Sequence, residues 1–147
     1  MFADFLRRLT APEPQQLSDP DARLALGALL VRLARADEVY TEEERARIDR
    51  VLAQRYGLSP FEAAALRAEA EQLEAEAPDT VRFTRAIKAA VPYEDRIGVI
   101  EALWEVVLAD GTRDDDEDAL LRMVAPMLGI SDPDSARARR RVADRGA

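Results

Sequence analysis

The sequence predicts an all-α protein, a single compact bundle of about seven or eight helices. Ala, Leu, Glu and Arg dominate the chain, and all four are strong helix formers. Apolar residues recur at helical spacing and do not alternate as they would in strands. Several Pro and Gly residues fall between the periodic segments. Because 48% of the residues are hydrophobic but only 5% are aromatic, we expect a mainly aliphatic core.

The first 17 residues are expected to form a short helix and a linker, and residues 18–147 to form the helical domain. Pro12 and Pro14 interrupt any helix in the linker. The first long helix should begin at Ser18–Asp19–Pro20, where a capping side chain precedes a proline at a permitted position. It should end near Ala36. Its inward stripe is Ala22, Leu26, Leu29, Leu30 and Leu33.

The next two helices have clear start and stop signals. Thr41 should open the second helix, and Gly57 should stop it. Ser59 and Glu62 form a capping-box pattern around a first-turn proline, so a third helix starts there and runs to about Ala77. The inward residues of these helices are Ile48, Val51, Leu52 and Tyr56, then Leu66 and Leu73.

Four further helices are expected to follow. Pro78 and Pro92 bound a short helix that carries Val81, Phe83, Ile87 and Val91. Three longer helices should begin near Glu94, at Asp114 or Asp115, and at Ser131, with Gly129 stopping the second of these. Their apolar faces comprise Ile97, Ile100, Leu103, Trp104, Val107 and Leu108, then Leu120, Leu121, Val124 and Leu128. The last helix is rich in arginine.

The composition excludes several classes of function. The chain has no Cys, so it has no thiolate nucleophile and no cysteine-held metal. It also has no His, the usual general base and transition-metal ligand, so we expect a non-enzymatic protein. Any metal must be held by oxygen, which favours Ca²⁺, Mg²⁺ or Mn²⁺. The net charge of -8 argues against nucleic-acid binding.

The chain lacks the features of a membrane or exported protein. No apolar run approaches the roughly 20 residues that a membrane-spanning helix needs. The first residues, "MFADFLRRL", lack a signal peptide's apolar stretch and cleavage site. We therefore expect a cytoplasmic protein without integral membrane association.

The two halves of the chain resemble each other. "LARADEVYTEEERARIDRVLAQRYGLSP" aligns with "VVLADGTRDDDEDALLRMVAPMLGISDP" at an offset of 73 for most positions. Asp37 then matches Asp110, and Glu44 matches Glu117. Each half is predicted to contain three helices, with an acidic turn before the second and a glycine stop after it. Two similar three-helix halves could pack with pseudo-twofold symmetry.

This duplicated pattern resembles the TerB-like (tellurite-resistance protein B) family. "YEDRIGVIEALWEVVLADGTRDDDEDALLRMVAPMLGIS" carries the resemblance best, and roughly residues 20–140 are covered. The resemblance implies a compact helical cytoplasmic domain associated with tellurite resistance and stress responses. It also implies binding of a divalent metal by acids of the two repeats, here Asp37, Glu44, Asp110 and Glu117. Glu38 stands where the family usually has Gly.

The acidic turns have a structural interpretation as well as a functional one. Thr41-x-x-Glu44 and Asp114-x-x-Glu117 both fit a capping box, which accounts for the two glutamates without a ligand. Asp37 and Asp110 are different, because a carboxylate at the end of a helix is disfavoured unless turn amides or a cation compensate it. Neither turn is an EF-hand, since Glu42 and Asp115 stand at the positions that require Gly.

The sequence thus leaves two functional hypotheses open, while the absence of His and Cys argues against a third, an enzyme of unrecognised chemistry. The first is a TerB-like stress-response domain that binds a divalent cation through the four acids and contacts protein partners. The second is a metal-free protein–protein adaptor. The final helix carries Arg137, Arg139, Arg140, Arg141 and Arg145. We expect a solvated end there, or a patch that meets the acidic turns of a neighbouring copy in a homodimer.

Overall fold

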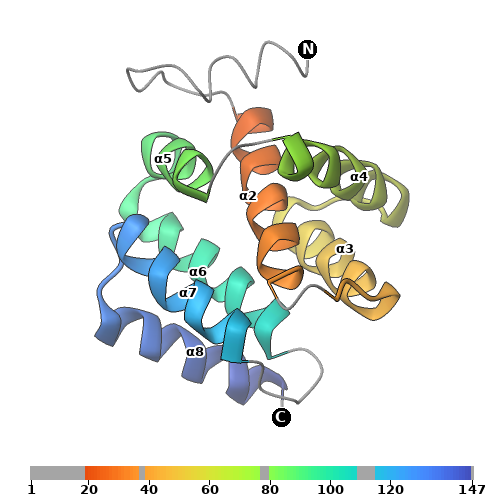
Figure 1. Cartoon of the computed structure of the whole chain (residues 1–147). Helices are drawn as coiled ribbons and strands as arrows, with labels where there is room; N and C mark the ends of the chain where they lie inside the picture. The colour runs from red at the N-terminus through yellow and green to blue at the C-terminus, as the bar shows by residue number, and fades with distance from the viewer. Residues whose placement is uncertain (1–18, 37–38, 77–79, 109–114, 147) are drawn as a thin grey trace.

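The computed structural model describes residues 19–36, 39–76, 80–108 and 115–146 (Figure 1). Within these ranges the protein has seven helices and no strand, which confirms the predicted all-α class. The helices are α2 (Asp19–Ala34), α3 (Glu42–Tyr56), α4 (Pro60–Glu76), α5 (Thr80–Ala90), α6 (Tyr93–Val107), α7 (Asp115–Met127) and α8 (Asp132–Gly146). Each helix begins within about two residues of its predicted start, and the helices for which an end was predicted end equally close to it, as expected of frayed ends.

Helix α2 lies at the centre of the molecule. It packs mainly against α4 and α5, and also contacts α3, α6 and α7 (Figure 1). The predicted stripe is buried, but so are residues on its other faces, namely Leu24, Ala25, Ala28 and Val31. A helix that is apolar all round must be covered on every side. This composition explains why α2, rather than a more amphipathic helix, occupies the middle of the bundle.

Gly27 allows α2 and α4 to approach each other closely. A Cβ atom at Gly27 would lie 2.9 Å from the Cβ of Ala70 on α4. That separation is shorter than van der Waals contact between carbon atoms. Arg32 of α2 also connects these two helices, because its Nη2 donates a 3.0 Å hydrogen bond to the carbonyl of Glu74 on α4.

Helices α3 and α7 end in the same local structure. Gly57 and Gly129 both have a left-handed backbone, with φ of 64° and 76°. After them, the amide of Leu58 donates to the carbonyl of Ala53 at 3.0 Å, and the amide of Ile130 donates to that of Ala125 at 2.9 Å. These hydrogen bonds are typical of a Schellman C-cap, so both predicted glycine stops are confirmed.

The next helix also begins alike in the two halves. Ser59 Oγ accepts from the amide of Glu62 at 3.1 Å, and Ser131 Oγ accepts from that of Asp134 at 3.3 Å. The matching turns agree with the predicted repeat at these points. Similarity of the two complete halves, with pseudo-twofold symmetry, stays a prediction.

Candidate functional site

The first acidic turn leads into α3 through a complete capping box. Thr41 Oγ1 accepts a 3.1 Å hydrogen bond from the amide of Glu44, and Glu44 Oε1 accepts a 3.0 Å hydrogen bond from the amide of Thr41. Thr41 Oγ1 also lies 3.1 Å from Glu44 Oε1. The predicted structural role of Glu44 is therefore confirmed, since its carboxylate satisfies the start of the helix.

The other three predicted metal ligands are not placed. Asp37 and Asp110 lie outside the described residues. Glu117 lies in the first turn of α7, but its side chain is outside the described part. Among the side chains that are described, no group of three or more acids is arranged to hold a metal ion. The four-residue metal site therefore stays a prediction.

Tyr40 anchors the first acidic turn to the rest of the protein. Its ring lies below the guanidinium groups of Arg45 and Arg35, at 4.8 and 5.9 Å from the ring centre. Burial, together with the Glu71 carboxylate, raises the pKa of the Tyr40 hydroxyl well above its ordinary value. The Tyr40 hydroxyl therefore stays neutral. The cation–π contacts fix the Tyr40 ring, and Tyr40 directly precedes Thr41, the first residue of the capping box.

A charge network behind this turn joins α3 to α4. Arg67 contacts both Asp49 on α3 and Glu71 on its own helix, with Nη1 of Arg67 at 3.1 Å from Glu71. Arg45 lies 3.6 Å from the same Glu71 carboxylate. Burial tends to lower the pKa of Arg67, but its two carboxylate partners outweigh that effect and raise it. The network holds α3 against α4.

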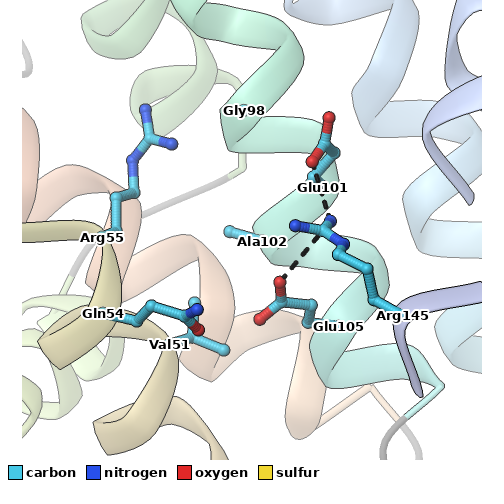
Figure 2. Close-up of a pocket in the computed structure, with 8 residues that line it drawn as sticks. All are labelled: Val51, Gln54, Arg55, Gly98, Glu101, Ala102, Glu105 and Arg145. Carbon is cyan, nitrogen blue, oxygen red and sulfur yellow. Dashed lines mark hydrogen bonds and ion pairs between the residues drawn. The ribbon is translucent and has the colours of Figure 1, made fainter. Parts of the chain in front are cut away.

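A polar pocket lies on another part of the surface, between α3, α6 and the end of α8. Its volume is about 260 Å³ (Figure 2). The pocket lining comprises Val51, Gln54, Arg55, Gly98, Glu101, Ala102, Glu105 and Arg145. Charged groups therefore come from all three helices, while Val51 and Ala102 supply apolar surface.

The two carboxylates of the pocket are partnered unequally. Glu101 receives Arg145 at 2.8 Å and Arg141 at 3.2 Å, both from α8. Glu105, one turn further along α6, has the same Arg145 guanidinium at 3.8 Å (Figure 2). Burial raises the pKa of Glu105 above its ordinary value, Glu101 adds to this, and Arg145 and Arg47 oppose it. Ionised Glu105 is thus only partly compensated.

The raised pKa of Glu105 predicts how the stability of the protein depends on pH. A carboxyl whose pKa is raised by folding stabilises the protein below its unfolded-state pKa, and this contribution is lost as the pH rises through the folded-state pKa. We therefore expect Glu105→Gln to gain stability relative to wild type as the pH rises from about 4 to about 7.5. Urea denaturation at the two pH values measures the difference. The exposed Glu69→Gln serves as control, and an equal difference at both pH values would contradict the prediction.

Arg55 forms the opposite wall of the pocket. Its Nη2 donates to the carbonyl of Asp95 at 3.3 Å, and its Nε is buried without a hydrogen-bond partner among the described residues. The guanidinium can lie this close to α6 because Gly98 has no side chain. A Cβ at Gly98 would lie 2.7 Å from Arg55 Nη1.

The arginine-rich helix α8 is tied to α6 rather than being merely solvated. Besides the contacts of Arg141 and Arg145 with Glu101, Arg139 lies over the Trp104 ring, 5.5 Å from its centre. Trp104 is buried, as predicted, and its Nε1 donates to Ser135 Oγ at 3.2 Å. Sequence reasoning missed the pocket. The only signal was the spacing of Glu101 and Glu105, which places two acids on one helix face opposite basic residues.

Comparison with known proteins gives one match. The family described as "Tellurite resistance protein TerB" matches residues 23–140, which is most of the chain. No curated protein and no solved structure matches this chain. In the described ranges, the helices are too short or too polar to cross a membrane.

Proposed function

The chain belongs to the TerB family, and from that membership we propose that it is a cytoplasmic, non-enzymatic binding domain of a tellurite-related stress response. In this proposal the two acidic turns hold a divalent cation, with Asp37, Glu44, Asp110 and Glu117 as ligands. The observation that carries the proposal is the family match, because residues 23–140 include all four acids. The cation then adjusts how the domain contacts protein partners.

The chemistry of the ligands supports a hard cation. Carboxylates and turn carbonyls are the oxygen ligands that Ca²⁺, Mg²⁺ and Mn²⁺ prefer. The chain has neither His nor Cys, so a softer metal would lack its usual ligands. In the chain, Asp37 and Asp110 follow shortly after the last residues of α2 and α6, and an acid close to the C-terminus of a helix is costly unless a cation compensates it.

Calorimetric titration of the full chain with Ca²⁺, Mg²⁺ and Mn²⁺ tests this proposal. We expect saturable binding of at least one ion, and a loss of affinity of about tenfold or more in Asp110→Asn, since even the outer partners of metal ligands contribute that much. Asp144→Asn, which changes an exposed acid on α8, should bind like wild type. Absence of cation-dependent heat in wild type would contradict the metal site.

A substitution at Glu44 separates its two roles. Glutamine at this position can keep the capping box, because its carbonyl also accepts from the Thr41 amide. It removes the negative charge that a cation needs. Glu44→Gln should therefore leave the helix intact by circular dichroism but weaken cation binding. If the affinity is unchanged, Glu44 acts as a cap alone.

The second candidate is a metal-free adaptor, which the exposed apolar side chains favour. Phe61 is 84% exposed at the start of α4, and Val39 is 55% exposed beside the first acidic turn. A contiguous exposed apolar patch marks a protein contact, and this candidate requires Phe61 or Val39 to belong to such a patch. Flat titrations, together with loss of a copurifying partner in Phe61→Ala, would support the adaptor. A homodimer through the arginine-rich helix is a further proposal, which sedimentation can measure.

A further inference from the structure

Helix α8 lies at the edge of the molecule and is attached to it through few apolar side chains (Figure 1). It packs mainly against α6 and to a smaller extent against α7. Of its described side chains, Ala138 and Val142 are the only apolar ones that are buried, whereas α2 is buried on all its faces. Packing of apolar side chains supplies most of a helix's stability in a protein, so α8 is held less firmly than α2.

Polar contacts at the surface make up much of the remaining attachment. Arg141 and Arg145 bind Glu101 on α6 at 3.2 and 2.8 Å, but these arginine side chains are 49% and 55% exposed. Tyr93, at the start of α6, donates an exposed 2.7 Å hydrogen bond to Asp134. Ion pairs between exposed groups contribute little to stability, because water and salt screen them. These contacts therefore set the position of α8 without holding it strongly.

Trp104 of α6 lies beneath α8 and is buried. Its indole Nε1 donates a 3.2 Å hydrogen bond to Ser135 Oγ, and the Arg139 guanidinium lies 5.5 Å from the ring centre. The Nε of Arg139 is itself buried and has no hydrogen-bond partner within the described part of the chain. A buried donor without a partner is costly, and water would satisfy this donor if α8 moved away from α6.

We propose that α8 is a cover over Trp104 that opens as a unit while the other described helices stay folded. Local opening of this kind occurs where an element has few buried apolar contacts. In the open protein, the Trp104 ring is exposed to water and its indole N–H has lost the Ser135 partner. The proposal does not depend on the metal site of the acidic turns. It rests on the small apolar attachment of α8 and on the position of Trp104 beneath it.

Native-state hydrogen exchange of the full chain, followed by NMR, tests the inference. The indole N–H reports opening directly, because Trp104 is the only tryptophan of the chain. We expect the amides of residues 138–142 and the indole N–H to share one protection factor, at least about tenfold below that of the slowest α2 amides. If the indole N–H is protected as strongly as those α2 amides, the proposal is wrong. A gradual loss of protection along α8, without one shared value, would show fraying of the helix and would equally contradict the cover.

Two substitutions show which part of the protein opens. Val142→Ala removes apolar contact of α8 and should lower the protection of α8 and of the indole N–H by about tenfold. Ile48→Val removes one methylene-sized group from the core at α3. It should lower the protection of the α2 amides by about fivefold but leave α8 and the indole N–H unchanged, because α8 opens while the core stays folded.

The matched control for Val142→Ala is the same substitution at an exposed position. Val39 is 55% exposed, so Val39→Ala should leave the protection of α2, α8 and the indole N–H nearly unchanged. The decisive result is that of Ile48→Val. An equal loss of protection at α2, at α8 and at the indole N–H in this variant would show that α8 opens only with the whole protein, which would overturn the proposal.

Discussion

Replacing Phe83 with alanine is expected to lower the free energy of unfolding by about 3–5 kcal/mol. Phe83 on α5 is fully buried in the core that surrounds α2. The substitution removes a large apolar side chain and leaves a cavity that rigid neighbouring helices fill only partly. It also removes the cation–π contact with Arg32, whose guanidinium lies 5.1 Å from the ring centre. Urea denaturation followed by circular dichroism measures the loss.

The matched control is the same substitution at an exposed phenylalanine. Phe61 is 84% exposed, so Phe61→Ala should change the free energy of unfolding by no more than about 0.5 kcal/mol. The side-chain deletion is the same in both variants, so burial and the Arg32 contact of Phe83 account for the difference. Equal losses in the two variants would show that α5 does not pack on α2 as described.

Introducing leucine at Gly27 should destabilise the protein by about 3 kcal/mol, the upper part of the usual range for overpacking. Leucine has a higher helix propensity than glycine, so the local effect alone would be stabilising by somewhat less than 1 kcal/mol. The close approach to Ala70 on α4 opposes it, because even the first carbon of the side chain would lie 2.9 Å from the Ala70 Cβ. The two helices would have to move apart. Chemical denaturation gives the sign directly.

Two further variants identify the cause. Ala68→Leu places the same side chain on an exposed position of α4 and should be nearly neutral, within about 0.5 kcal/mol. The exchange Gly27→Ala with Ala70→Gly moves one methyl group from α4 to α2. It should be more stable than Gly27→Ala alone, since the contact is relieved. A stabilised Gly27→Leu protein would rule out close packing at this crossing.

The sequence predicted the helices well because their ends depend on local chemistry. The capping box of Thr41 and Glu44 and the left-handed Gly57 and Gly129 each follow from residues a few positions apart. The inward stripes followed from periodicity, because residues three or four apart share one face of a helix. These features require no knowledge of how the helices are arranged. They could therefore be predicted before any tertiary contact was known.

The candidate sites were less predictable. The family resemblance and the acidic turns predicted Asp37, Glu44, Asp110 and Glu117 as metal ligands, and that set stays a prediction. The polar pocket was not predicted, since its charged residues come from three separate helices; Glu101 and Arg145, for example, are 44 positions apart in the chain. Each residue alone is typical of a solvated helix face. Only their convergence makes a site.

By itself, the sequence determined an all-helical chain, the residues near which each helix begins, and membership of the TerB family. The tertiary structure decided that α2 is covered on all sides, that Gly27 brings α4 against it, and that Arg55 and Glu105 face one cavity. The physical reason is the range of the interactions. Caps and helix faces depend on residues a few positions apart in the chain. Burial and the grouping of charged side chains depend on which distant parts of the chain come into contact.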